Sequence, residues 1–303
     1  MKLCKLASCL LLVLLCLTYV TLAADTPSLT FKFKTYSVPG ALQTWLTGVN
    51  NSGVIAGWYA DSQANFHGFT LTDGKFKQID DPSGDQTEIW GINSSGDLVG
   101  FYHDPCIEEL CYEGFIYHAG QFTNIGPPWF RTPPEDDAPD SEGFGINDSG
   151  TVVGSAGAGF GGNIGFVLQN HKYKKLQVPQ VNGGGAVGIN NAGLVTLNWA
   201  TNKFDGASVY DGKTYKNIDV PNSVDSYASG INNVNDVVLA FDPGIGKPIH
   251  GALLHAGKYY KFFFSKGKNE TYPLGLNDKH TIVGVWTLGG STDIHVHGFI
   301  ATY

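Results

Sequence analysis

The tripeptide Gly-hydrophobe-Asn returns six times along this chain of 303 residues. Successive asparagines lie 42 to 54 residues apart. A period of this size predicts supersecondary units that are stacked in a row or arranged in a ring. The six copies are Gly48-Val49-Asn50, Gly91-Ile92-Asn93, Gly145-Ile146-Asn147, Gly188-Ile189-Asn190, Gly230-Ile231-Asn232 and Gly275-Leu276-Asn277.

Each repeat has the pattern of four short strands. In the first repeat, residues 44–49 and 54–59 flank the turn Asn50-Asn51-Ser52-Gly53, and residues 67–71 and 76–80 form a second hairpin. Two hairpins joined by a loop predict a four-stranded meander. The sixth position of the turn is Gly in four repeats and Asn235 or His280 in the others, which indicates a left-handed backbone at this position.

The distribution of the fourth strands favours a ring over a row. The sixth repeat ends at Tyr303, directly after its third strand, whereas residues 31–39 have the fourth-strand pattern and no repeat before them. In a ring, the first segment can complete the last unit. We therefore predict an all-β fold, a six-bladed β-propeller of four-stranded meander blades that is closed by the N-terminal strand. A linear β-solenoid or an array of β-sandwiches is the alternative.

The first 23 residues have the order of a secretory signal: a basic start, an apolar run and small residues before the cleavage point. A single membrane anchor is the competing interpretation. We predict that residues 24–303 form one six-repeat domain that is secreted or extracellular, or held in the periplasm or at the cell surface. Loss of Lys2 and Lys5 with the signal takes the formal net charge from −8 to −10. We therefore expect a monomer that binds neither nucleic acid nor a membrane.

Two cysteines, Cys106 and Cys111, remain after the signal and lie five positions apart in one insertion. In an exported protein such a pair predicts a disulfide. A metal site, with His103, Glu108 and Glu109 as further ligands, is the alternative. A second insertion, residues 126–141, is rich in proline and acidic residues.

No sequence motif predicts catalysis, a cofactor or a metal. Residues 157–162 match a dinucleotide-binding fingerprint by letter, but they follow a meander strand and precede no helix, so we interpret them as a loop. His67, His250 and His297 precede the third-strand glycine in three repeats. We interpret them as structural hydrogen-bonding groups of separate blades, and a ring of ligands is the alternative.

The loops that enter the inner strands of a propeller meet at one mouth of its channel. Acidic and aromatic residues alternate there, an arrangement that suits a sugar or a cationic group, although the aromatic rings could equally fill the core. The predicted ligand-binding residues are Glu88, Trp90, Glu142, Asp225, Tyr227, Glu270 and Tyr272, with Gln43, Trp45 and Phe144 beside them. We predict a non-catalytic binding or scaffold protein for glycan or protein ligands. A polysaccharide lyase or hydrolase that uses the mouth carboxylates is the alternative, and a purely structural envelope protein is a third possibility.

The repeat also resembles a known family. The Asn-Asn-Ser-Gly turn, the sequence Val99-Gly100-Phe101-Tyr102, the His-Gly-Phe of residues 67–69 and Ile218-Asp219-Val220-Pro221 are similar to the bacterial secreted "HAF" extracellular repeat proteins. The resemblance spans residues 24–303, although the fourth and fifth repeats have lost the return-strand glycine and the third-strand phenylalanine. It implies an exported repeat protein and supplies no catalytic residue.

Overall fold

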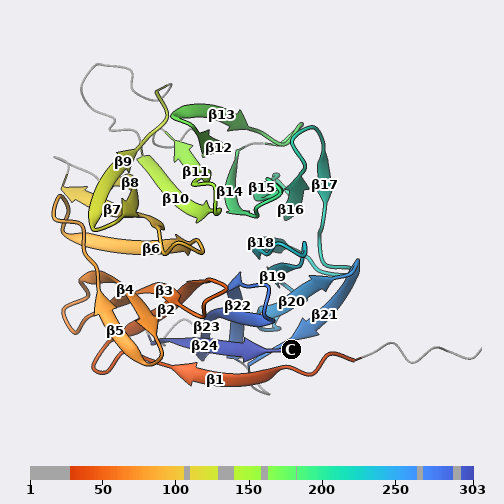
Figure 1. Ribbon diagram of the computed structural model, residues 1–303. Helices are drawn as coiled ribbons and strands as arrows, with labels where there is room; N and C mark the ends of the chain where they lie inside the picture. Colours follow the sequence, from red (N-terminus) through yellow and green to blue (C-terminus); the bar gives the residue numbers. More distant parts are fainter. Residues whose placement is uncertain are drawn as a thin grey trace, which may run out of the picture.

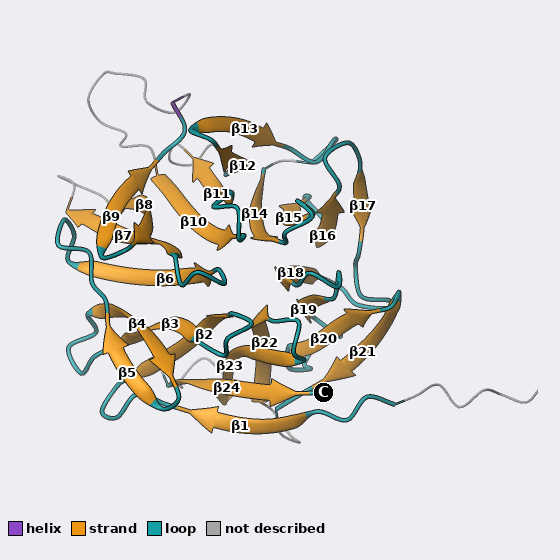
Figure 2. Cartoon of the chain, viewed as in Figure 1, coloured by secondary structure: helices purple, strands orange, loops and turns teal. Residues whose placement is uncertain are grey.

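The computed structural model describes residues 28–105, 110–128, 140–157, 163–181, 183–264, 269–288 and 295–303, and at 104–105, 110–111 and 140 it describes the backbone alone. The signal segment, Cys106, the side chain of Cys111, most of the proline-rich insertion and most of the glycine loop at 157–162 lie outside this part. Within it, strands make up nearly all of the regular structure, and the short helical segment in Figure 2 is a 3-10 turn at Pro128 rather than an α-helix. No helix in these ranges is long and apolar enough to cross a membrane.

The strands of the described part form two eight-stranded and two four-stranded sheets, which we divide into six successive groups of four strands, called units. Unit 1 holds β2 (Gln43–Val49), β3 (Ile55–Ala60), β4 (Phe66–Thr72) and β5 (Lys75–Gln78). Unit 2 holds β6 (Gln86–Ile92), β7 (Leu98–Pro105), β8 (Leu110–His118) and β9 (Gln121–Ile125). Unit 3 holds β10 (Asp140–Ile146), β11 (Val152–Gly157), β12 (Ile164–Gln169) and β13 (Lys172–Leu176). Unit 4 holds β14 (Gly184–Ile189), β15 (Val195–Ala200), β16 (Asp205–Tyr210) and β17 (Tyr215–Asn217). Unit 5 holds β18 (Ser226–Ile231), β19 (Val237–Phe241), β20 (His250–His255) and β21 (Lys258–Phe262). Unit 6 holds β22 (Asn269–Leu276), β23 (Thr281–Leu288), β24 (Val296–Thr302) and, from the other end of the chain, β1 (Lys32–Tyr36).

The units follow one another around a centre. Within each unit, successive strands pair antiparallel. The first strands of the units, β2, β6, β10, β14, β18 and β22, lie innermost (Figure 1), and each contacts the next, with β22 contacting β2. Between units the sheets face each other through apolar layers, such as the one built from Val153, Leu176 and Leu197. The hydrophobic core is therefore divided among the junctions between neighbouring units.

Strand β1 pairs antiparallel with β24, from Lys32 opposite Thr302 to Tyr36 opposite Gly298. The aromatic ring of Phe33 packs edge-on against those of Phe264 and Phe299, 5.7 and 5.6 Å away. The backbone N–H of Val38, just past β1, donates to Thr44 of unit 1, in the way that Asp81 just past β5 donates to Thr87 of unit 2. β1 thus occupies in unit 6 the place that β5 occupies in unit 1.

The turns after the inner strands have the predicted left-handed residue. Gly53, Gly96, Gly150 and Gly193 have φ between 75° and 86°, and Asn235 and His280 have φ of 68° and 62°. A positive φ at this position closes the hairpin loop with little steric cost for Gly and a tolerable cost for Asn. The turn prediction is confirmed in all six repeats.

The asparagine of each repeat links its own unit to the next one. Its Oδ1 accepts the backbone N–H groups two and four residues further on, which fixes the turn. Its Nδ2 donates to the backbone carbonyl of the equivalent asparagine in the following unit, over 3.0 to 3.2 Å. The order is Asn50 to Asn93, Asn147, Asn190, Asn232, Asn277 and back to Asn50. We call this closed circle the asparagine ring.

The asparagine ring gives a stability prediction. Asn277 is 5% exposed, and its side chain makes three hydrogen bonds, one of which joins unit 6 to unit 1. Asn277→Ala leaves those backbone groups unpaired, so we expect a loss of about 2–4 kcal/mol in the free energy of unfolding. Denaturant unfolding followed by circular dichroism measures it.

The matched control for this variant is Asn202→Ala, at an exposed asparagine in the β15–β16 loop, which should change the free energy of unfolding by less than about 0.5 kcal/mol. Equal effects of the two substitutions would contradict a structural role for the ring.

Candidate functional site

A β-bulge interrupts the pairing of every inner strand with its return strand. In unit 1, Leu46 pairs with Gly57 and Gly48 pairs with Ala56, so that Thr47 is left over. A bulge leaves one residue unpaired and re-aims its side chain. The unpaired residues are Thr47, Trp90, Phe144, Val187 and Leu274 in units 1, 2, 3, 4 and 6, and Ser229 with Gly230 in unit 5.

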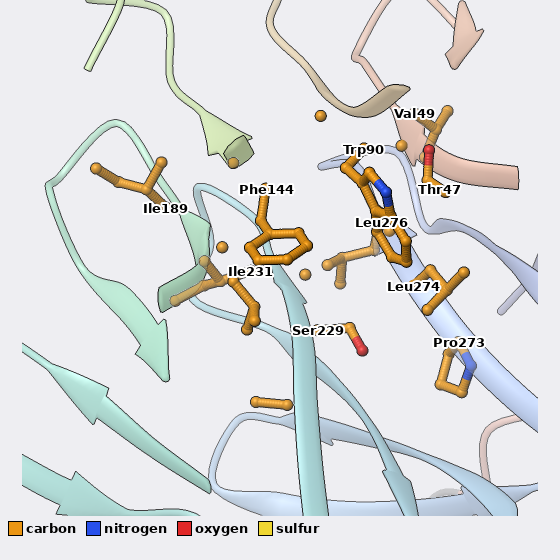
Figure 3. A pocket seen from close by; sticks show the side chains of 18 of the residues that line it. Thr47, Val49, Trp90, Phe144, Ile189, Ser229, Ile231, Pro273, Leu274 and Leu276 are labelled. Carbon is orange, nitrogen blue, oxygen red and sulfur yellow. The ribbon is translucent and has the colours of Figure 1, made fainter. Parts of the chain in front are cut away.

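The residues at the bulges line a cavity in the centre of the molecule, which we call the chamber. It has a volume of about 400 Å³ and is lined by residues of all six inner strands. In Figure 3, the rings of Trp90 and Phe144 project into it beside Leu274. Tyr227 and Tyr272 complete an aromatic wall. A largely apolar, aromatic-lined cavity with a few polar groups is typical of a ligand site.

The glycine that follows each bulge lets the inner strands converge on the chamber. A Cβ atom on Gly188 would lie 2.6 Å from the carbonyl oxygen of Ser229 in the next unit, and one on Gly275 would lie 2.7 Å from that of Thr47. Contacts this short exclude any side chain. At these two positions, the glycine of the repeated tripeptide is therefore required by the approach of the neighbouring backbone around the channel.

The predicted acidic residues do not lie free at the mouth. Glu88 is 7% exposed and accepts a hydrogen bond from the indole N–H of Trp90 at 3.1 Å. The carboxylate of Glu270 accepts the hydroxyl hydrogen of Tyr272 at 2.9 Å. Glu142 accepts one from Ser155 at 2.7 Å. Each of these carboxylates therefore already accepts a hydrogen bond from a neighbouring side chain.

The predicted residues also stand at two different levels along the channel. Glu88 and Glu142 precede their ring asparagine by five residues, at the same level as Tyr227 and Tyr272 in units 5 and 6. Trp90 precedes it by three. Of the predicted binding residues, Trp90, Tyr227 and Tyr272 line the chamber, together with Phe144, whereas the four acids are not among its lining residues. Alignment of the repeats on the asparagine would have revealed this offset in the sequence.

Tyr227 and Tyr272 act as hydrogen-bond donors. Burial, followed by a hydrogen bond to Asp205, raises the pKa of Tyr227 well above its ordinary value. Burial and the bond to Glu270 do the same for Tyr272. Both phenols therefore stay protonated at any physiological pH. Asp225, the remaining predicted acid, accepts the backbone N–H of Asp205 at 2.8 Å. Asp205 is a polar group at the mouth that the sequence analysis missed.

A buried histidine lies next to Glu88. The Nε2 atom of His103 is 3.6 Å from Oε1 of Glu88, and neither ring nitrogen has a hydrogen-bond partner. The rings of Phe66 and Tyr112 pack edge-on against the imidazole. From the sequence, His103 is a candidate only for a metal site with Cys106 and Cys111, whose side chains lie outside the described part of the chain. Within the described ranges, no group of three or more His, Cys, Asp or Glu side chains could hold a metal ion.

The repeated histidines agree in part with the structural interpretation. His67 contacts Asp80, just past the fourth strand, at 3.0 Å, and His297 contacts Ser37 in the corresponding place at 3.0 Å. His250 instead packs against the rings of Phe241 and Phe263. All three lie on separate third strands, β4, β24 and β20.

The opposite end of the channel is polar. There the residue after each ring asparagine forms a second set of hydrogen bonds between units, in which the carboxylates of Asp148 and Asp278 accept from their neighbours. Burial acts to raise the pKa of Asp278, but hydrogen bonds from Asn233 and Asn51 outweigh it and hold the pKa below its ordinary value. The same balance, with bonds from Ser94 and Asn191, lowers the pKa of Asp148.

Comparison with known proteins defines the class of fold. No family model and no curated protein sequence matches the chain. Among solved structures, it is similar to TolB from Acinetobacter baumannii, with a TM-score of 0.54 and 11% identity over 83% of this chain and 64% of that one. It is also similar to the Trypanosoma rangeli sialidase in complex with 2,3-difluorosialic acid, with a TM-score of 0.51 and 9% identity over 90% of this chain and 54% of that one.

A third similar structure is the β-propeller domain of the Trilobed protease from Pyrococcus furiosus, with a TM-score of 0.46 and 11% identity over 86% of this chain and 94% of that one. At identities this low, the comparisons concern the fold alone. The chain is all-β, and its structural neighbours with a TM-score above 0.5 are β-propellers.

The lowered pKa of Asp278 predicts a pH-dependent stability. A lowered folded-state pKa stabilises the fold fully above the ordinary value of 3.8, and this contribution is lost as the pH falls through the folded-state value. We expect Asp278→Asn to lower the free energy of unfolding by roughly 1 kcal/mol at pH 6, because a charged acceptor is replaced by a neutral one. The difference from the parent protein should shrink towards pH 3.

Thermal unfolding of both proteins between pH 3 and pH 6 measures this difference. Asp73→Asn, in the exposed β4–β5 turn, is the control and should show little difference from the parent at any pH. If Asp278→Asn is less stable than the parent by the same amount over this whole range, the carboxylate charge is not the cause of the lost stability.

Proposed function

We propose that this protein is an exported, six-bladed β-propeller, closed by β1, that binds a ligand through its chamber without catalysing a reaction. We also propose that it belongs with the HAF-type extracellular repeat proteins. The six-bladed arrangement is supported by the contacts of the inner strands in cyclic order, by the asparagine ring and by the pairing of β1 with β24.

The chamber is the observation on which the binding function rests. It is central, and the unequal side chains at its bulges make it asymmetric. Bulky rings come from units 2 and 3, and small or aliphatic groups come from units 1, 4, 5 and 6. A glycan unit suits this cavity, because the apolar face of a sugar ring can stack on Trp90 or Tyr272. Its hydroxyl groups can donate to the carboxylate of Asp205, which lies beside the chamber residue Tyr227.

The alternative of a polysaccharide lyase or hydrolase has less support. Acid–base work on a glycoside needs two carboxyl groups that face the reacting bond. Glu88 is buried behind Trp90, and Glu270 is held by Tyr272 of its own strand. These contacts position the aromatic rings and leave the carboxylates as supporting groups.

The test is a glycan-array screen followed by calorimetric titration of the best ligand. Val187 projects into the chamber from the bulge of unit 4, so Val187→Phe should fill the space and weaken binding at least about 10-fold. Val234→Phe, on an exposed turn at the opposite end of the channel, is the control and should bind as the parent does. Chromatography of the incubated glycan tests for catalysis at the same time.

Two outcomes would contradict this proposal. Parent-like binding by Val187→Phe would place the ligand outside the chamber. Release of shortened or unsaturated glycan products by the parent protein would favour the enzyme instead.

A further inference from the structure

Large exposed hydrophobic side chains gather at one end of the molecule. Seven such side chains occur among the described residues, and five lie on connections at the end of the channel opposite the asparagine ring. Their exposed fractions run from 42% for Phe204 to complete exposure for Ile245. We call these five the apolar rim: Phe204, Val224, Ile245, Phe263 and Leu288.

The apolar rim extends over loops and strand ends of units 4, 5 and 6. Phe204 lies in the β15–β16 loop, and its neighbour Asp205 donates its backbone N–H to Asp225, the neighbour of Val224. The backbone N–H of Val224 donates to the carbonyl of Asp242, at the start of the loop that carries Ile245. On the other side of that loop, the ring of Phe263 packs against His250. Leu288 ends β23, opposite Asn269 at the start of β22.

Four carboxylates lie towards the channel from this rim, which we call the acidic row: Asp205, Asp225, Asp242 and Glu270. Asp205 and Glu270 accept from the hydroxyls of Tyr227 and Tyr272, and Asp225 is hydrogen-bonded to the backbone N–H groups of Asp205 and Asp242. These bonds place all four residues around one side of the mouth. In the described part of the chain, none of them forms an ion pair with a lysine or arginine. Lys203 and Lys247 lie on the same loops, but neither forms an ion pair with a carboxylate of the acidic row in the described part.

We propose that the apolar rim and the acidic row form a docking surface for a peptide segment of another protein, in which a basic side chain is flanked by apolar residues. Exposed apolar side chains over three adjacent units suit an extended peptide better than a small molecule. The basic group would lie over the faces of Tyr227 and Tyr272 and pair with the acidic row. The flanking side chains would cover the apolar rim. This proposal shares Tyr227 and Tyr272 with the chamber, but the apolar rim and the acidic row on which it rests lie outside the chamber lining.

The experiment uses fluorescein-labelled nine-residue peptides and fluorescence anisotropy. The probe has a central lysine between leucine and phenylalanine, and one comparison peptide has glutamate in place of the lysine, while another has serines in place of the apolar residues. We expect the probe to bind at least about 10-fold more tightly than either comparison peptide and more weakly at high salt.

Two variant pairs locate the binding on the surface. The double variant Val224→Ser/Ile245→Ser removes exposed rim groups and should lower the affinity for the probe at least about 10-fold. Val234→Ser, at the opposite end of the channel, should leave this affinity unchanged. Asp225→Asn/Asp242→Asn keeps an oxygen acceptor for the local backbone bonds but removes two charges. This variant should lose the preference for lysine over glutamate, and the exposed-turn control Asp73→Asn should retain it.

Three results would overturn the docking proposal: no binding of the probe, equal binding of the glutamate peptide, or probe affinity unchanged in the rim variant. Peptide binding that Val187→Phe abolishes and the rim variant preserves would assign the peptide to the chamber. Glycan binding in the chamber, with no peptide binding here, would leave the proposed function intact and remove only the docking surface.

Discussion

The closed circle of asparagine hydrogen bonds is the interaction on which the arrangement of the units depends. One side chain per unit shapes its own turn through Oδ1 and holds the next unit through Nδ2, and Asn277 returns the circle to Asn50. These side chains are 2–6% exposed, where an unpaired amide would be costly. This double role explains why asparagine, rather than aspartate or serine, recurs in all six units.

The same convergence of backbones creates the cavity at the centre. Neighbouring inner strands approach closely at their glycines. Next to these glycines, the pairing with the return strand is interrupted by a β-bulge, which turns one side chain towards the axis. The bulge is therefore constant while the side chain that it presents varies, from Trp90 to Val187. The asparagines, glycines and bulges that the repeats share form the scaffold, whereas the bulge side chains, which differ between repeats, form the proposed binding cavity. Acidic residues such as Glu88 hold aromatic rings such as that of Trp90 in place through hydrogen bonds.

Much of the fold was predictable, because turn and strand patterns are local. Residues 31–39 were recognised as a displaced fourth strand from their pattern alone, and β1 indeed pairs with β24. Less of the candidate site could be predicted from the sequence. The bulge shifts the alternation of inward and outward positions within a strand, so the simple alternation of a strand gives Glu88 and Trp90 the same orientation, and only alignment of the repeats on the asparagine shows their offset. Ser155 and Asp205 meet the predicted residues only through pairing between strands, which a single sequence does not disclose.

The closure of the ring between unit 6 and unit 1 can be tested by hydrogen exchange of side-chain amides, observed by NMR in the intact protein. The asparagine ring predicts slow exchange of the Nδ2 hydrogens of Asn50, Asn93, Asn147, Asn190, Asn232 and Asn277, with the protection of Asn277 equal to that of the other five. Exchange of Asn277 as fast as that of the exposed Asn202, with the other five protected, would show an open arc of units and contradict the closed ring.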